Sequence, residues 1–295
     1  MKQRKISESF FNQLTSGELH PLLEAVHEDD TLCMELRGNV VNIYYRGGSL
    51  FCIEETSGKY LLTFDKNYCD DRSVHLPEHP SPSEATELIP HYKQAMDHWF
   101  HRNPKYEREF QQLILRENNC LSGKISKSTD YFIVDVEYAE TGARFDMVAL
   151  KWLSESAARK NAKKPTLALI EVKYGDGALR GDAGIQKHLS DMNQFLTNKE
   201  LLKDFCEDMS QVFWQKCELG LVEGLVEKQY QVSIRPEDAE VIFIFANHDP
   251  DSRILDEELT MAKAQNYPFP IKIAQSSVMV YGLYASRLKD LQDFR

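Results

Sequence analysis

The sequence predicts an α/β protein, with a central mixed sheet and an α-β-β-β-α-β core preceded by a small N-terminal α+β region. Three patterns indicate this class. Short strands with a period of two lie near the N-terminus, three longer apolar strands lie in the middle, and amphipathic helices flank them. At roughly 150 residues per domain, the 295 residues correspond to about two units. The 42% hydrophobic and 27% charged residues are typical of a globular protein, which excludes a disordered chain.

The N-terminal region combines a helical segment with a predicted antiparallel meander. Apolar residues at helical spacing indicate helix within 6–28. Four short alternating runs separated by turn residues predict strands over 32–37, 40–46, 50–55 and 60–65. Three prolines within 75–83 then predict a linker. These features divide the chain into an N-terminal region, 1–90, and a second domain, 91–295.

The second domain begins with two predicted helices. One lies near 90–101, and the next runs from Asn103-Pro104 to about Asn118, because proline is favoured at the first helical position. The expected elements after it are strands over 131–138, 143–152 and 166–174, a helix over 184–197 and a buried strand over 240–246. The tail predicts a helix near 254–266, strands within 270–283 and a last short helix.

The net charge of −11 argues against a general nucleic-acid coat protein, but the charge is unevenly distributed. Residues 101–199 hold 16 basic and 13 acidic side chains, so the acidity lies mainly outside them. No apolar run approaches the roughly 20 residues that span a bilayer, and polar residues stand where a signal peptide is apolar. The six cysteines are scattered, without a Cys-x-x-Cys pair. We therefore expect a cytoplasmic protein with no membrane partner.

The residues that suggest chemistry lie on two of the middle strands. Glu171 and Lys173 are two residues apart in an apolar strand, so their side chains share a face. Such charges are unfavourable in a buried strand unless they are paired or bind a ligand, although an exposed edge strand would also explain them. Antiparallel pairing would bring Asp146 of the preceding strand within about 5 Å of Glu171. Carboxylates that close repel each other unless a cation such as Mg²⁺ lies between them.

Further carboxylates lie near this set in the sequence. Glu107 borders the buried stripe of the helix before the strands, and we prefer it to Glu109 as a site residue. A solvated helix charge is the alternative for either. Asp135 and Glu137 share a face of the first middle strand, for which a polar outer face is favoured over a second metal site.

Asp146 followed by Glu171-x-Lys173, after a helix that bears a glutamate, resembles the PD-(D/E)XK nuclease superfamily, which has the restriction-endonuclease-like fold. The local sequence is most similar to archaeal Holliday junction resolvases. Their opening helix carries Glu-Arg-Glu before an apolar residue, like 107–110 here, and their strands read Asp-Leu-Val and Ile-Glu-Val-Lys, like 146–148 and 170–173. The resemblance covers roughly residues 103–250.

This chain departs from the superfamily pattern at two points. Phe145 precedes the aspartate where the superfamily's name has proline. The Gln-x-x-x-Tyr motif of RecB-like exonucleases is absent, because Gln186 is followed four positions later by Ser190. The choice between endonuclease and exonuclease therefore stays open.

The resemblance implies metal-dependent hydrolysis of phosphodiester bonds in DNA or RNA, with Mg²⁺ as the usual ion and Mn²⁺ as a substitute. It assigns Asp146, Glu171 and the carbonyl of Val172 as metal ligands. It also assigns Lys173 to position or activate the attacking water, and Glu107 to hold the water shell of the metal.

Four lysines outside the motif are predicted to contact the nucleic acid, with DNA as the first candidate. Lys160, Lys163 and Lys164 lie in the loop between the second and third middle strands and could clamp phosphates beside the metal site. Lys187 on the following helix could assist them. A solvated loop is the alternative for the first three.

Other functions stay open. The fold could serve as a catalytically silent module that binds nucleic acid or protein. The glycine-rich segment 175–181 weakly suggests dinucleotide binding, with a loop beside the active site as the alternative. Tyr44, Tyr45 and Arg46 could stack bases or belong to a half-buried strand. The N-terminal region could also mediate a homodimer or bind a protein partner.

Overall fold

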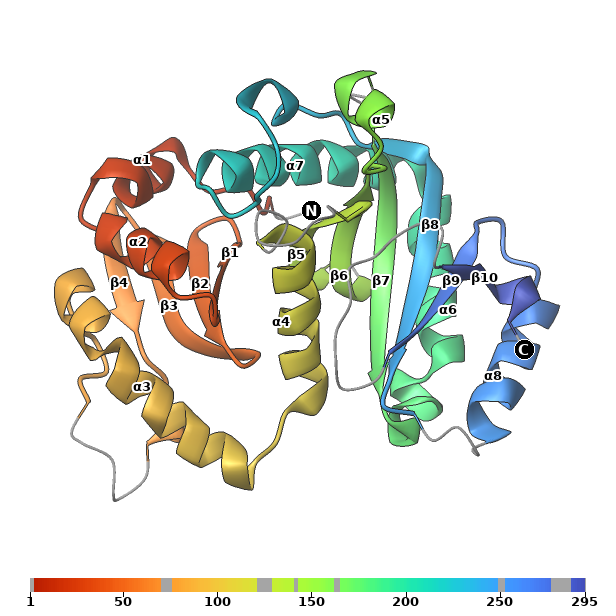
Figure 1. Ribbon diagram of the computed structural model, residues 1–295, viewed down its shortest axis with the longest axis horizontal. Helices are drawn as coiled ribbons and strands as arrows, with labels where there is room; N and C mark the ends of the chain where they lie inside the picture. Colours follow the sequence, from red (N-terminus) through yellow and green to blue (C-terminus); the bar gives the residue numbers. More distant parts are fainter. Residues whose placement is uncertain are drawn as a thin grey trace.

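The computed structural model describes residues 3–69, 76–120, 129–140, 143–161, 165–248, 253–276 and 288–294. Over these residues the chain is a mixed α/β protein with two sheets (Figure 1). The small sheet has the order β1-β2-β3-β4, with β1 (Leu32–Leu36), β2 (Val40–Tyr45), β3 (Gly48–Thr56) and β4 (Lys59–Thr63). The large sheet has the order β10-β9-β8-β7-β6-β5, with β5 (Tyr131–Glu140), β6 (Ala143–Lys151), β7 (Thr166–Tyr174), β8 (Arg235–Ala246), β9 (Ile271–Ser276) and β10 (Lys289–Asp290).

Eight α-helices lie within the described residues. Three accompany the small sheet: α1 (Glu8–Ser16), α2 (His20–Glu28) and α3 (Pro82–Arg102). The others are α4 (Tyr106–Asn119), α5 (Ser156–Asn161), α6 (Ile185–Thr197), α7 (Lys199–Glu218) and α8 (Arg253–Ala264). Among these helices, none is long and apolar enough to cross a membrane.

The predicted antiparallel meander is confirmed, with strand ends that shift by one or two residues. The helical segment within 6–28 consists of two helices rather than one continuous run. Gly17 ends α1, and Pro21 lies in the first turn of α2. Proline has no N–H to donate, so it is tolerated at a helix start and not in a helix interior.

The linker predicted over 75–83 is shorter than expected, because α3 begins at Pro82. The Ser81 side chain accepts a hydrogen bond from the Glu84 N–H, and this cap makes proline at the first helical position favourable. The described part of the predicted linker therefore ends at Ser81.

Helix α3 continues through Pro90, so the domain boundary expected at residue 90 lies inside a helix that packs on α2 and β3. It ends with Asn103 as its C-terminal cap. The prediction that Asn103 and Pro104 open the next helix is wrong, since α4 begins at Tyr106. Pro104 lies in the short connection between the two helices.

β7 lies within the large sheet, antiparallel to β6 and parallel to β8, and only its two terminal residues are not buried. Ile170 and Val172 pack with Phe110 of α4, whereas Leu167 and Leu169 belong to the cluster that includes α6 and α7. The order α4-β5-β6-β7-α6-β8 agrees with the predicted α-β-β-β-α-β order, with α5 and α7 as additions.

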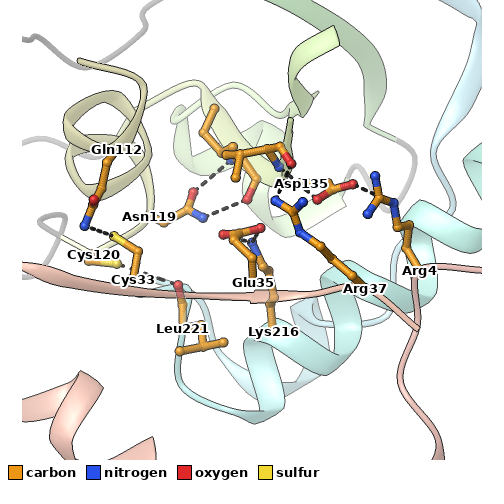
Figure 2. Close-up of polar contacts among 12 residues, drawn as sticks. Arg4, Cys33, Glu35, Arg37, Gln112, Asn119, Cys120, Asp135, Lys216 and Leu221 are labelled. Atoms are coloured by element: carbon orange, nitrogen blue, oxygen red, sulfur yellow. Dashed lines mark hydrogen bonds and ion pairs between the residues drawn. The ribbon is translucent and has the colours of Figure 1, made fainter. Parts of the chain in front are cut away.

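Buried charges join the N-terminal region to the large sheet and to α7 (Figure 2). Arg4 Nε lies 3.2 Å from Asp135 Oδ2 on the edge strand β5. Arg37, which follows β1, donates a 2.8 Å hydrogen bond to a β5 carbonyl. Lys216 Nζ on α7 donates to both carboxylate oxygens of Glu35 on β1, at 2.7 and 2.8 Å, and both side chains are 1% exposed. These contacts cover a strand edge that would otherwise expose unpaired backbone groups.

Helix α4 lies between the two sheets (Figure 1). Gln112 on α4 accepts a hydrogen bond from the Gly47 N–H and donates to the carbonyls of Thr31 and Tyr44, at 2.9 and 3.2 Å. Gly47 has a φ of 74°, and a Cβ there would lie 2.4 Å from the backbone carbon of Arg108. Only glycine allows the β2–β3 turn to approach the helix this closely.

The buried pair Glu35–Lys216 generates a stability prediction. Lys216→Met should lower the free energy of unfolding by about 3–5 kcal/mol, because it leaves a buried carboxylate without its partner. Glu35→Met combined with Lys216→Met should recover most of that loss. Urea denaturation followed by circular dichroism measures all three proteins.

The matched control is the exposed pair Arg235–Asp238, which has an N–O distance of 3.3 Å. Asp238→Ala should change the free energy of unfolding by less than about 1 kcal/mol. Equal losses at the two pairs would contradict the role assigned to Glu35 and Lys216.

Candidate active site

The two strands that carry the predicted motif separate at the site. The β6–β7 ladder ends at the pair Met147–Ile170, and Asp146 and Glu171 are the next residues. The Asp146 Oδ2 accepts a 2.7 Å hydrogen bond from the Val172 N–H, in place of a backbone acceptor. The Asp146 charge acts on the Glu171 carboxyl group, and both side chains line one cavity. The two carboxyl groups therefore converge where the strands part.

Glu171 is surrounded unevenly. Its Oε1 accepts a 2.6 Å hydrogen bond from Lys173 Nζ and lies 3.0 Å from His188 Nε2 on α6. Its Oε2 is buried and has no hydrogen-bond partner among the described residues. Glu171 and Lys173 are only 1% and 3% exposed, so the exposed ion pair on an edge strand does not describe them. One oxygen is fixed by the protein, and the other is left for a ligand.

Burial is the largest cause of the pKa shifts of Asp146, Glu171 and His188. It raises the pKa of Asp146 to about 6, against the Val172 N–H and the Lys173 charge, which lower it. Burial, followed by the Asp146 charge, raises the pKa of Glu171 well above its usual value. Burial and then Lys173 lower the pKa of His188 to about 4, so this imidazole is neutral at pH 7. The charged forms of the two carboxyl groups are therefore unfavourable in this site.

The strands change face beside this pair. Residues two apart on a strand normally share a face, yet Val136 belongs to the cluster with α4 and Tyr138 to the cluster with α6 and α7. Met147 and Phe145, their partners on β6, divide in the same way. Glu137 lies between them with a φ of 51°, a left-handed conformation that is uncommon outside glycine. Because of this irregularity, Glu137 on β5 and Asp146 on β6 both line one cavity.

The cavity has a volume of about 490 Å³. Its acidic lining residues are Glu107, Glu137, Asp146, Glu171, Asp182 and Asp191, and its basic ones are Arg108, Arg144, Lys173 and Lys187. Carboxylates thus outnumber cationic side chains by six to four. A polyanionic ligand is repelled by such a lining unless a cation accompanies it.

The two glutamates at the start of α4, Glu107 and Glu109, have different surroundings. Glu107 lines the cavity, and its Oε2 lies 3.4 Å from the Tyr174 N–H, which donates to it at the end of β7. Its charge is among the causes that raise the pKa of Asp146 and Glu171. Glu109 instead pairs with Arg46 of the small-sheet region, with a 2.9 Å N–O distance. Glu107 is therefore the helix carboxylate that faces the motif.

The motif residues fit a magnesium ion. Glu171 offers its unpartnered Oε2, Asp146 converges on it, and the Val172 carbonyl points to the same side as the Val172 N–H that binds Asp146. Across the described residues, no three His, Cys, Asp or Glu side chains are grouped to hold a metal. Mg²⁺ usually keeps several waters and takes one or two carboxylates, so this donor set suits it.

The lysines predicted to bind phosphate are placed less favourably. Lys160 lies on α5, which connects β6 to the start of β7, whereas Glu171 lies near the other end of that strand (Figure 1). The five residue steps from Thr166, at the start of β7, to Glu171 span about 17 Å. Residue 160 is therefore remote from the cavity, contrary to the clamp expected beside it. Lys163 and Lys164 lie outside the described residues.

Lys187 does line the cavity, on the first turn of α6. It pairs with Asp191 one turn later on the same helix and is exposed. It can therefore reach a ligand at the cavity mouth, while Asp191 offsets part of its charge.

Several charged or polar cavity residues were not predicted as site residues, and three of them lie beside the motif. His188 contacts Glu171, and Arg144 and Glu137 lie on the strands beside Asp146. His188 follows Lys187 in the sequence, and its helical spacing from the buried Ile185 was the available signal. Glu137 carried no such signal, because its orientation depends on the change of face in β5.

Two other expectations are resolved by contacts. Asp135 is fully buried against Arg4, so the polar outer face predicted for Asp135 and Glu137 is wrong. A break in the β5–β6 register after Ile133 turns Asp135 inward. Arg46 pairs with Asp97 as well as with Glu109, which favours the half-buried strand over a base-stacking surface there.

Comparison of the chain with protein-family models, with curated proteins and with solved structures finds no match in any of the three.

The raised pKa of Asp146 generates a pH prediction. A carboxyl whose pKa is higher in the folded than in the unfolded protein destabilises the fold as pH rises through the folded value. In EDTA, Asp146→Asn should therefore be more stable than the wild type at pH 7, by about 2–3 kcal/mol. The difference should shrink between pH 6 and pH 4 as Asp146 is protonated. Urea denaturation at three pH values measures it.

Asp238→Asn, at an exposed aspartate, is the control and should show no comparable trend. A stability difference for Asp146→Asn that is the same at pH 4 and pH 7 would show that charge is not its cause.

Proposed function

We propose that the protein is a metal-dependent nuclease that hydrolyses phosphodiester bonds of DNA or RNA. The observation that carries this proposal is the convergence of the Asp146 and Glu171 carboxyl groups beside Lys173, on a cavity at the end of the β6–β7 ladder. Structural ion pairs seldom leave a buried carboxylate oxygen without a partner, as Glu171 Oε2 is here.

The arrangement of elements supports the same proposal. Helix α4 brings Glu107 to the end of β7, and the β5–β6–β7 strands are followed by α6, which covers the motif from the other side. This is the order expected of a restriction-endonuclease-like core, to which we assign the large-sheet region. Fold alone does not decide activity, so the proposal depends on the site residues.

In the proposed reaction, a water attacks phosphorus while the bond to the leaving alkoxide breaks; the water loses a proton and the alkoxide gains one. Asp146 and Glu171 would hold Mg²⁺, which supplies Lewis acidity beside the phosphate. Lys173 stays close to the reacting oxygens through Glu171 and stabilises negative charge on the phosphate. His188 fixes the Glu171 carboxylate from α6 and keeps the other oxygen directed at the ligand.

Cleavage assays test the chemistry. Labelled single- and double-stranded DNA and RNA incubated with Mg²⁺ should be cut by the wild type, and EDTA should abolish cutting. Lys173→Ala and Asp146→Asn should each lower the rate by about a hundredfold or more, since each removes charge stabilisation in the transition state. Products resolved on a denaturing gel also distinguish internal from terminal cuts.

Lys151 gives a matched control. It lies on β6, pairs with Glu240 at 2.9 Å and does not line the cavity. Lys151→Ala should keep the cleavage rate of the folded protein within about twofold of the wild type, because the Lys151 side chain does not line the cavity. Wild-type protein that binds these substrates but cuts none of them with Mg²⁺ or Mn²⁺ would favour the catalytically silent module.

The charge of the cavity lining generates a separate binding prediction. Without a divalent ion, six carboxylates against four cations should keep nucleic acid out. The double variant Asp146→Asn/Glu171→Gln should therefore bind DNA in EDTA at least about tenfold tighter than the wild type, without cutting it. Fluorescence anisotropy with a labelled strand measures the affinity.

The control variant Glu237→Gln/Asp238→Asn removes the same charge from an exposed segment at the start of β8. It should bind like the wild type. If both double variants bind equally well, net charge rather than the cavity governs binding.

A further inference from the structure

Two tyrosines stack beside the candidate active site. The rings of Tyr106 and Tyr174 have centroids 5.4 Å apart and an angle of 20° between their planes. Each tyrosine is the sequence neighbour of a site residue, since Tyr106 precedes Glu107 and Tyr174 follows Lys173. The hydrogen bond from the Tyr174 N–H to Glu107 joins the two segments at this point.

The Tyr106 ring is highly exposed for an aromatic side chain. Tyr106 is 54% exposed and is the aromatic residue among the large hydrophobic side chains that the described residues expose. The inner ring is supported from below, because Phe110 packs against Tyr174 with centroids 6.1 Å apart at 64°. The Tyr106 ring is therefore held on one face by Tyr174, which packs on Phe110, and the rest of its surface is open to solvent.

The loop after Tyr174 is open at its first two glycines. Gly175 directly follows Tyr174 and Gly177 comes two residues later, and a Cβ built at either meets no atom within 4 Å among the described residues. Farther along, Asp182 and Ala183 of the same connection line the cavity. The loop therefore runs from the tyrosine pair to the cavity lining and is uncrowded at these two glycines.

We infer that Tyr106 is a stacking platform for a nucleobase of the substrate strand, next to the phosphate that the motif would cut. The inference rests on the proposed nuclease function and adds its substrate class. Aromatic rings bind bases of any sequence through their π-faces. A base within an intact duplex is already stacked on both sides and has no face to offer, so the platform selects single-stranded or unpaired nucleotides.

A binding experiment separates this inference from the nuclease proposal. The Lys173→Ala background with Mg²⁺ prevents cutting, and the probes are a fluorescein-labelled DNA single strand and a blunt duplex of the same sequence. Tyr106→Leu should weaken single-strand binding by roughly tenfold, the value expected for one stacked base, and duplex binding by less than about twofold. Tyr106→Phe keeps the ring and should bind both probes as the parent does.

Stacking also has a direct readout. A strand that contains 2-aminopurine should lose fluorescence on binding the Tyr106 protein, because ring stacking quenches this base. Titration with strands carrying the base at successive positions locates the subsite, and Tyr106→Leu should abolish the quenching at that position alone.

The matched control is Tyr267, which stacks on Phe269 with centroids 5.5 Å apart at 26° and lies in the connection between α8 and β9, away from the motif residues in the sequence. Tyr267→Leu should leave both affinities unchanged. Single-strand affinity that survives Tyr106→Leu, or an equal loss for strand and duplex, would overturn the platform while leaving the nuclease proposal intact. Failure of the parent protein to bind any probe, together with no cleavage by the wild type, would overturn both.

Discussion

The desolvation of two carboxyl groups at the end of the β6–β7 ladder is the constraint on which the rest of the structure depends. Burial raises the pKa of both Asp146 and Glu171, and the Asp146 charge raises that of Glu171 further, so negative charge on both groups is unfavourable in this poorly solvated site. Lys173 and His188 satisfy one oxygen of Glu171 and leave the other unpartnered. A fold that keeps such a pair must hold it from all sides, because a loose site would separate the charges or admit water.

The surrounding elements supply that restraint. β7 is buried between β6 and β8, α6 approaches from one face, and α4 brings Glu107 from the other. Helix α4 is in turn fixed by the small sheet, through Gln112 and the close approach of Gly47. The N-terminal region therefore contributes to the geometry of the site although none of its described residues lines the cavity. Its buried charges against β5 and α7 make the attachment specific, since each loses a partner if the region shifts.

Much of this organisation could be predicted from local sequence. The strands and the main helices follow from periodicity, and the antiparallel pairing expected of the second and third middle strands indicated that Asp146 and Glu171 would meet. The misses have physical reasons. The predicted linker included Pro82 and the predicted helix began only near residue 90, but α3 begins at Pro82 after the Ser81 cap and continues through Pro90. The change of face at Glu137 needs a left-handed residue that no sequence pattern marks. Lys160 was placed by its charge, although strand direction already sets the loop at the far end of β7.

The acidity of the chain has a consequence for how a nucleic acid could enter the site. The net charge is −11, and the cavity itself carries more carboxylates than cationic side chains. Long-range attraction therefore cannot supply much of the affinity, in contrast to proteins that coat nucleic acid with lysine and arginine. In the proposed nuclease, affinity would come from short-range terms: a cation held by the carboxyl pair, and contacts that do not depend on charge, such as the base stacking proposed at Tyr106. A substrate that offers an unpaired base next to an accessible phosphate satisfies both terms at once, and an intact duplex satisfies only the first.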